Sequence, residues 1–420
     1  MAIARTPWLT STISLAASGA VGNGTDESTL LQNFLDNLPP GTTAIVPPGV
    51  TYTLAQPIAL GDDIAIYQYP NVTGGFKLAN DDLTLRAFTT KSGNRKNIAL
   101  ANVSILGAGD GKPRGQSPGA SGLHLNDVEG LVITNLRVAK VGGVGCIIQG
   151  VRRFFLQRIN ISQTGRGALV LWGLGYGLED GYIGGLKVFS PGDDGLAIQA
   201  SHGSPGRLNG VLNYYDTQAG SAIVTIGNSG TANLDASLIG QPINIANAGG
   251  NDESGNTMPH ETSIAAVINN STMILATPAL KTVTNSAGYY NYRRARNVTV
   301  ENIFVVGRNE VLADNYGRSI LFEGCENMTL NRAVLYNAVS SNLYIVREFE
   351  QTGEDLWSRN IVANDIRLYN AGQYQHPTLN QPKDNIRING AYNVRLNQIV
   401  SVNPGGVDYV DVAGFNNVAA

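Results

Sequence analysis

The chain has 420 residues, of which 43% are hydrophobic and 15% charged, and its formal net charge is −3. The apolar content is enough for a large core, and the low charge excludes a disordered chain. The small net charge excludes the strongly basic surface that nucleic acid or an anionic membrane would require.

The N-terminal part predicts one helix and no targeting segment. Ser and Thr interrupt MAIARTPWLTSTISLAASGAVG, so we expect no signal peptide, and the absence of a run of about 18 apolar residues predicts no membrane insertion. The stretch 25–41 begins with Asp26 as a candidate N-cap and stops at Pro39-Pro40. We expect this helix to cap the end of the fold. Its apolar face consists of Leu30, Leu31, Phe34, Leu35 and Leu38.

An internal repeat of short strands occupies most of the remaining chain. Segments such as LVITNLRV (131–138) and MTLNRAVLY (328–336) share alternating apolar residues broken by a pair that often contains Asn. The alternation predicts strands, and the Asn pair predicts a tight left-handed corner. Such a unit, repeated at intervals of about 23 to 33 residues, is one coil of a solenoid. The anchor residues of the repeat are Leu100, Ile133, Leu156, Ile183, Leu208, Val300, Leu330, Ala363 and Leu396.

The repeat is interrupted at 228–292, where alternating strands are separated by Gly, Asn and Ser turns. This pattern predicts an inserted antiparallel β subdomain, which fits a binding surface as well as a subunit contact. The expected division of the chain is an N-terminal segment with the capping helix (1–45), a first solenoid part (46–227), the insertion (228–292), and a second solenoid part with the C-terminal end (293–420).

The N-terminal stretch ASGAVGNGTDESTLLQNFLDNLPPGTTAIVPPGVTYTL, followed by these coils, resembles the pectate-lyase-like superfamily. Phage tailspikes and many polysaccharide-cleaving enzymes share this pattern. The resemblance implies an all-β fold, a right-handed single-stranded parallel β-helix with an N-terminal capping helix and the small antiparallel β insertion.

The segment LKVFSPGDDGLAI (186–198) resembles the Gly-Asp-Asp turn of polygalacturonases. The resemblance implies that Asp193 and Asp194 are the acid and the water-activating base of glycoside hydrolysis. The coil before departs from that family, because Gly165-Arg166 stands where the family has another Asp, and the coil after lacks the expected His. Pro-Gly-Asp-Asp-Gly is also a turn sequence in its own right, so a plain turn remains the alternative.

A second acidic cluster is YIVREFEQTGEDLW (344–357), in which Glu348 and Glu350 are further candidate catalytic carboxylates. A solvated loop is the alternative for this segment. Aromatic, carboxylate and arginine side chains suit a glycan groove. The candidate substrate-binding residues are Trp172, Tyr176, Glu179, Asp180, His202, Arg318, Arg347 and Trp357.

We expect no metal and no cofactor. The four histidines lie on separate segments, and Cys146 and Cys325 predict buried free thiols rather than zinc ligands.

These observations predict a phage tailspike-type receptor-binding protein that binds a bacterial surface polysaccharide and depolymerises it, as a glycoside hydrolase rather than a lyase. The resemblance implies a homotrimer in a virion tail, with other phage tail proteins as further partners, and neither nucleic acid nor a membrane is an expected partner. One alternative is a secreted polygalacturonase- or pectate-lyase-like enzyme. Another is a structural tail β-helix without catalysis.

Overall fold

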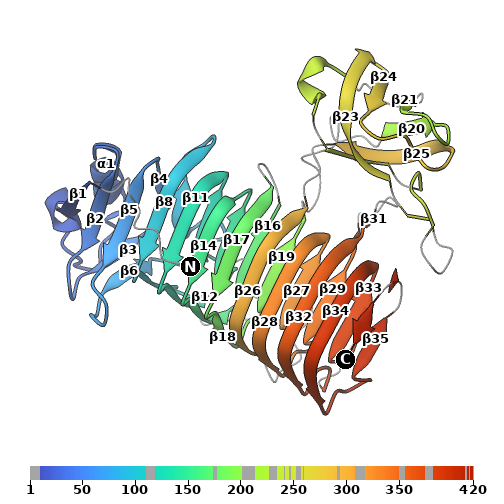
Figure 1. Cartoon of the computed structure of the whole chain (residues 1–420). Helices are drawn as coiled ribbons and strands as arrows, with labels where there is room; N and C mark the ends of the chain where they lie inside the picture. Colours follow the sequence, from blue (N-terminus) through green and yellow to red (C-terminus); the bar gives the residue numbers. More distant parts are fainter. Residues whose placement is uncertain are drawn as a thin grey trace.

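The computed structural model describes residues 10–419 apart from 110–118, 174–176, 201–212, 227–233, 241, 246, 252–256, 259, 291–293, 308–316, 350–354, 374–381, 412–413 and 416. Short parallel strands coil into an elongated solenoid, and a separate barrel stands off its side (Figure 1). The predicted right-handed parallel β-helix is therefore confirmed. No helix in the described part of the chain is long and apolar enough to span a membrane.

One sheet of ten parallel strands forms what we call the ten-stranded face. Its outward side chains are central to the candidate site below. Its strands are β4 (Ile58–Leu60), β7 (Arg86–Thr90), β10 (Ser121–Asn126), β13 (Cys146–Gln149), β16 (Leu169–Trp172), β19 (Leu196–Gln199), β27 (Ile320–Glu323), β29 (Leu343–Val346), β33 (Ile386–Asn389) and β35 (Tyr409–Asp411).

A sheet of 19 strands covers the other two faces, because long strands such as β26 pair with both β17 and β18. The middle face begins with β1 (Ser11–Ser14), β2 (Thr42–Val46), β5 (Ile64–Gln68), β8 (Arg95–Ala101), β11 (Val128–Thr134), β14 (Arg152–Gln157) and β17 (Leu178–Gly184). The third face begins with β3 (Thr51–Leu54), β6 (Gly75–Leu78), β9 (Ser104–Leu106), β12 (Arg137–Val141), β15 (Asn160–Thr164) and β18 (Lys187–Phe189). Both continue through β26 (Ala295–Val306), β28 (Cys325–Tyr336), β32 (Ser358–Tyr369) and β34 (Ala391–Val402), and the middle face ends with β36 (Gly414–Phe415) and β37 (Val418–Ala419).

The anchor residues predicted from the repeat lie in one column of the middle face. Ile133 pairs in register with Leu100 on one side and Leu156 on the other, and the column continues to Leu396. All of the described anchors are buried in the solenoid core. Leu208 lies outside the described residues.

The corners of the coils are built by residues in the left-handed conformation, as the Asn pairs predicted. Asn360 has a φ of 54°. It donates to Asn327 and accepts from Asn393, each at 3.1 Å. Only Gly, Asn and Asp adopt this conformation readily, and Asn adds a side-chain ladder along the axis. These Asn residues are therefore stacked corners.

The N-terminal end is covered by a 3-10 turn, η1 (Leu15–Ser18), and by the predicted helix, α1 (Ser28–Asp36). Leu31 and Leu35 pack into the core, whereas Leu30 is 47% exposed and does not belong to the buried face. The Asp26 carboxylate accepts from the backbone N–H groups of Ser28 and Ala55, both at 3.0 Å. It therefore fastens the start of the helix to the first coil.

The insertion is a closed six-stranded antiparallel barrel with its own apolar core around Ile245, Ile264 and Met273. It begins with β20, before the boundary at 228 that the sequence suggested, because short alternating strands look the same in a solenoid and in a barrel. The strands are β20 (Asn213–Thr217), β21 (Ile223–Ile226), β22 (Pro242–Ile245), β23 (His260–Asn269), β24 (Thr272–Leu275) and β25 (Val283–Tyr290), with a 3-10 turn, η3 (Ala236–Leu238).

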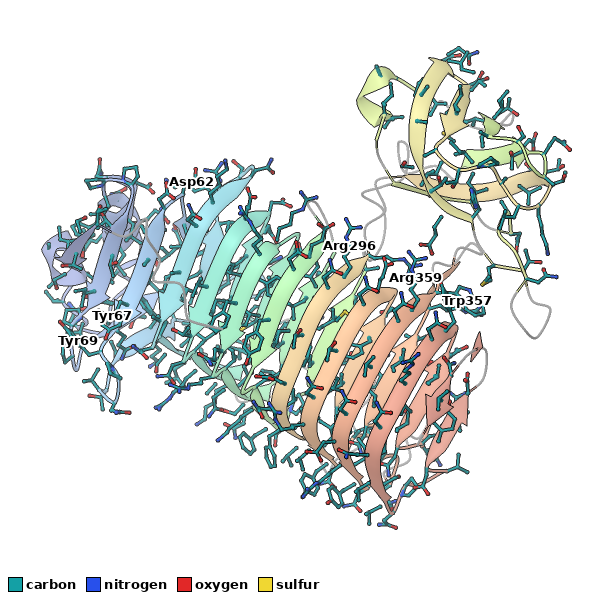
Figure 2. The ribbon with its side chains drawn as sticks, viewed as in Figure 1. Asp62, Tyr67, Tyr69, Arg296, Trp357 and Arg359 are labelled. Atoms are coloured by element: carbon teal, nitrogen blue, oxygen red, sulfur yellow. The ribbon has the colours of Figure 1, made fainter. Side chains whose placement is uncertain are left out.

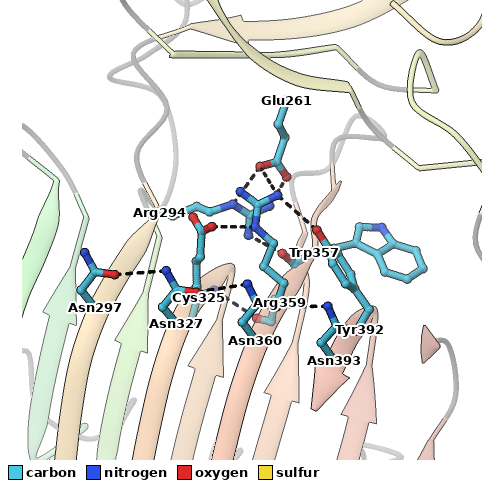
Figure 3. Close-up of polar contacts among 12 residues, drawn as sticks. Glu261, Arg294, Asn297, Cys325, Asn327, Trp357, Arg359, Asn360, Tyr392 and Asn393 are labelled. Atoms are coloured by element: carbon cyan, nitrogen blue, oxygen red, sulfur yellow. Dashed lines mark hydrogen bonds and ion pairs between the residues drawn. The ribbon is translucent and has the colours of Figure 1, made fainter. Parts of the chain in front are cut away.

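The barrel is fastened to the solenoid by a cluster of charges (Figure 3). Glu261 on β23 accepts from Arg294, with Nε and Oε2 2.9 Å apart, and also pairs with Arg359 of β32 at 3.4 Å. Arg294 is 7% exposed and donates to the backbone carbonyl of Trp357. Arg359 pairs in turn with Glu326 at 3.0 Å. Arg296, Trp357 and Arg359 all lie at the edge of the solenoid that faces the barrel (Figure 2).

Candidate functional site

The candidate site lies on the outer side of the ten-stranded face, over β16, β19, β27, β29 and β33. Because side chains alternate along a strand, Leu196 and Ile198 point into the core while Ala197 and Gln199 point outward. The strands β19 and β27 are neighbours, although the barrel separates them in the sequence. The insertion therefore brings the segment after it back onto the coil that carries Asp193 and Asp194.

Asp194 is held by a bidentate ion pair with Arg318 of the next coil. Arg318 donates from Nε to Oδ1 at 2.7 Å and from Nη2 to Oδ2 at 2.9 Å. The backbone N–H of Arg318 also donates to Oδ1 at 3.0 Å. Asp194 is buried. Both carboxylate oxygens are thus engaged by one residue.

The pKa of Arg318 reflects the carboxylates around it. Burial disfavours the charged guanidinium, but the carboxylates of Asp194 and Asp193 outweigh burial and raise the pKa of Arg318. Glu323, at the far end of β27, acts in the same direction. One guanidinium therefore lies in the field of three carboxylates, which favour its charged form.

A second Asp–Arg pair lies two coils further along the axis. Arg387 on β33 donates from Nη1 to Oδ2 of Asp384 at 2.8 Å. Tyr344 lies on the intervening strand, directly beside Arg387 in the register. The guanidinium of Arg318 lies over the ring of Tyr344, 5.8 Å from its centroid. An aromatic ring is therefore flanked by two arginines, each held by its own aspartate.

The opposite ends of the strands carry a row of planar polar side chains. Trp172, Gln199 and Glu323 are register neighbours on β16, β19 and β27. The indole N–H of Trp172 donates to Gln199 Oε1 at 2.5 Å, and the Gln199 amide donates to Glu323. The row thus ends on a carboxylate.

An apolar floor separates the row from the Asp–Arg pairs. It consists of the side chains of Val170, Ala197 and Leu321, which point outward from the sheet and are nevertheless buried, and Val346 packs against them from the register position beside Glu323. A small pocket beside Asp193 and Arg318 is too narrow for a sugar ring. A ligand of that size would have to lie across the face.

The structure brings together four of the residues singled out from the sequence, Asp193, Asp194, Arg318 and Trp172. Asp193 accepts a long hydrogen bond from the backbone N–H of Gly317, at 3.3 Å. This geometry fits the alternative that Asp193 and Asp194 form a turn, because both carboxylates accept hydrogen bonds from the backbone of the next coil. For Asp194, pairing with Arg318 adds to that role.

Glu179 and Asp180 do not join this site, because they lie on the middle face. Glu179 pairs with Arg296 at 2.5 Å and with Arg152 at 3.6 Å. Asp180 is in the left-handed conformation and accepts a hydrogen bond from Asn297 at 3.0 Å, so it belongs to the ladder of stacked corner side chains that continues through Asn297 to Asn327.

Arg347 and Trp357 occupy structural positions. Arg347 directly follows β29, and its side chain packs against the backbone at Gly390. Trp357 is only 3% exposed. A buried ring offers no open surface for stacking on a sugar, and the position of Trp357 against the Arg294 cluster explains its burial.

The remaining predicted residues are described in part or not at all. Glu348 belongs to a two-residue strand, β30 (Glu348–Phe349), which pairs with β31 (Asp355–Leu356), and only its backbone is described. Tyr176, His202 and Glu350 lie outside the described residues.

Sequence reasoning missed Gln199, Glu323, Tyr344, Asp384 and Arg387. All except Asp384 occupy outward positions of short strands whose inward residues are apolar and alternate as in the repeat, so the alternation alone was a usable signal. To assign each outward residue to its neighbour on the next coil, the register between the strands on either side of the insertion would have had to be known.

Among the described residues, no group of three or more His, Cys, Asp or Glu side chains is arranged to hold a metal ion. Both cysteines are buried thiols, and the Sγ of Cys325 donates to the backbone carbonyl of Ile198 at 3.2 Å. Burial raises the pKa of the Cys146 thiol. These thiols therefore serve as packing groups.

No protein-family model matches the chain, and no curated protein matches it in sequence. Solved structures do match. The N-terminal fragment of bacteriophage Phi29 gene product 12 has a TM-score of 0.52 at 12% identity, over 93% of this chain and 57% of that one. The family 28 exopolygalacturonase of Yersinia enterocolitica has a TM-score of 0.50 at 8% identity, over 98% of this chain and 79% of that one.

Tailspike protein 2 of the Escherichia coli O157:H7 bacteriophage CAB120 matches over 96% of this chain and 41% of its own length, at 9% identity and a TM-score of 0.48. At identities this low, the likeness to the Phi29 and Yersinia enterocolitica structures is a likeness of fold alone. The chain has a right-handed parallel β-helix, the fold that the sequence resemblance implied.

Proposed function

We propose that this chain is a phage tailspike-type receptor-binding protein of the virion tail, which binds a bacterial surface polysaccharide across the outer side of the ten-stranded face. One observation carries the proposal. Five strands of that face gather an aromatic–amide–carboxylate row, two Asp–Arg pairs and a tyrosine around a sealed apolar floor. Sugar sites combine these groups, since rings pack on aromatic faces and hydroxyls bind fixed planar groups.

The likeness in fold supports the class of ligand. One of the similar structures comes from a bacteriophage, and another is an exopolygalacturonase, so the same architecture occurs in a phage protein and in an enzyme that acts on a polysaccharide. Fold alone does not assign function, and the proposal therefore rests on the site.

The geometry favours binding over hydrolysis by Asp193 and Asp194. A glycoside hydrolase needs one carboxyl group that can donate a proton and a second one free to act on water or on the sugar. Asp194 gives both oxygens to Arg318, and a bound guanidinium stabilises the charged carboxylate. Depolymerisation by this pair is the alternative that the experiment below decides.

The proposal includes self-association, to the homotrimer that the tailspike resemblance implies. The outer side of the third face offers an apolar surface for it. Phe189, Val400 and Val402 are 38%, 47% and 43% exposed. Between them the rings of Tyr336 and Tyr369 stack 4.6 Å apart. Continuous apolar strips of this kind on a sheet commonly mark contacts with another protein.

The test is binding of purified O-antigens and capsular polysaccharides to the wild-type chain and to Trp172→Ala and Tyr344→Ala. We expect each variant to bind its polysaccharide tenfold or more weakly, the usual cost of removing a central aromatic. Tyr69→Ala is the matched control, because Tyr69 is 46% exposed and lies near the end of the solenoid away from the barrel (Figure 2).

Reducing-end release is measured in the same samples. Release by the wild type that disappears in Asp193→Asn, or in Asp194→Asn protein that circular dichroism shows to be folded, would establish depolymerisation by this pair, and binding without release would establish a binding protein. Absence of binding to every polysaccharide, or equal binding by all three aromatic variants, would overturn the proposal.

A further inference from the structure

We infer that the polysaccharide bound by this site is uncharged, an inference that rests on the proposed function and specifies its ligand. The carrying observation is that, in the part of this face that the structure describes, the two arginines on either side of Tyr344 are each paired with an aspartate. Arg318 pairs with Asp194 and Arg387 pairs with Asp384. Glu323 and Asp193 add further negative charge beside Arg318.

An acidic sugar would have to compete with these pairs. Uronates and phosphates are held by guanidinium groups that present two N–H donors in one plane. Arg318 directs two such donors, from Nε and Nη2, to Asp194. Displacing Asp194 would leave a carboxylate buried without its partner, and an uncompensated buried charge is strongly unfavourable.

A neutral sugar makes no such demand. Its hydroxyl groups can donate to carboxylate oxygens of Glu323 and Asp193 and can accept from amides such as Gln199. Its C–H faces can pack on Trp172 and Tyr344, which both pack against the apolar floor. Each of these contacts leaves the Asp–Arg pairs in place.

Arg166 offers a cation that is not part of these two pairs. It lies on the coil before Asp193, and its backbone carbonyl accepts from the N–H of Gly192. An acidic polysaccharide held by Arg166 would lose affinity when Arg166 is replaced, whereas a neutral one would not. This difference separates the two kinds of ligand by a single substitution.

The experiment uses the full-length protein and a panel of purified bacterial polysaccharides, some neutral and some bearing uronate or phosphate. Each uronate polymer is also tested after chemical reduction of its carboxyl groups. Affinities are measured at about 50 mM and about 500 mM NaCl, since salt screens a charge contact and leaves neutral contacts largely unchanged. The same polymers are tested with Arg166→Gln.

We expect binding to a neutral or a carboxyl-reduced polymer, with less than a twofold change between the two salt concentrations and between wild type and Arg166→Gln. Binding to an acidic polymer that is lost on reduction, or that weakens tenfold in high salt or in Arg166→Gln, would overturn this inference and leave the proposed function standing. Binding to no polymer of the panel would overturn both.

Discussion

Arg318 binds both carboxylate oxygens of Asp194, although the two residues are 124 positions apart in the sequence and a whole barrel is inserted between them. The pair joins the last coil before the barrel to the first coil after it. Breaking one partner of a buried ion pair is strongly destabilising, because the other charge is left without compensation. The position that most resembles a catalytic motif is therefore also a structural joint.

Replacing Asp194 tests this joint. We expect Asp194→Asn to lower the free energy of unfolding by about 3–5 kcal/mol, since the partly buried guanidinium of Arg318 would lose its charged partner. Urea denaturation followed by circular dichroism measures the change. Asp193→Asn is the control and should cost less, because the hydrogen bond to Gly317 is long at 3.3 Å. A variant Asp194→Asn as stable as the wild type would contradict the structural role.

Two substitutions at Asn360 separate the contribution of the hydrogen bonds between stacked Asn side chains from that of the left-handed backbone conformation. Asn360→Ala loses the hydrogen bonds to Asn327 and Asn393 and also puts alanine, which lacks the polar side chain that helps Asn adopt the left-handed conformation, at a φ of 54°. Asn360→Gly loses the same hydrogen bonds but tolerates the conformation. We expect Ala to be less stable than Gly by about 1–2 kcal/mol in urea denaturation. Equal stabilities would show that the backbone conformation contributes little here.

The ion pairs of Glu261 hold the barrel against the solenoid, and removing the charge of Glu261 tests how strongly they do so. In Glu261→Gln, Arg294 and Arg359 would face each other without the carboxylate between them. We expect the barrel to detach from its seat while its own core stays folded, seen as an increased radius of gyration in X-ray scattering and faster proteolysis between barrel and solenoid. Glu326→Gln, which removes an ion pair of Arg359 on the solenoid side, should leave the scattering curve unchanged.

The ten-stranded face also contains a group that makes stability depend on pH. Burial and the nearby Arg86 guanidinium lower the pKa of His124, although a hydrogen bond with Gln149 opposes the shift. As pH falls below about 6.5, the unfolded chain therefore takes up a proton more readily than the folded one, and stability is lost. We expect His124→Gln to lose less stability than the wild type between pH 7 and pH 5 in thermal denaturation. Parallel curves for the two proteins would refute this contribution.

Charge placed on the third face should oppose self-association. Tyr369→Asp and Val402→Asp introduce carboxylates into neighbouring register positions of the exposed apolar strip. We expect light scattering to show smaller assemblies than for the wild type at the same concentration. The control Leu280→Asp alters an apolar side chain of the barrel that is 64% exposed, and it should not change the mass. A monomeric wild type would contradict the proposed assembly.

The sequence was sufficient to predict the coils but not the contacts between them. The anchors from Leu100 to Leu396 could be aligned because burial imposes a period of two on every coil. The partner of Asp194 could not be found in this way, because the insertion hides which coil follows β19. The outward residues Glu323 and Tyr344 were missed for a related reason, since alternation marks them as outward but does not show which side chains of the neighbouring coils they contact.

A ribosome completes β19 long before β27, its neighbour in the sheet. At roughly 5–20 residues per second, the 124 positions between Asp194 and Arg318 take about 6–25 s to synthesise. During that interval the half-built solenoid ends in an unpaired strand edge, which is prone to join other chains. The barrel, with a separate core, can fold in the meantime. The nascent chain is therefore expected to be most prone to aggregate while its barrel is being made.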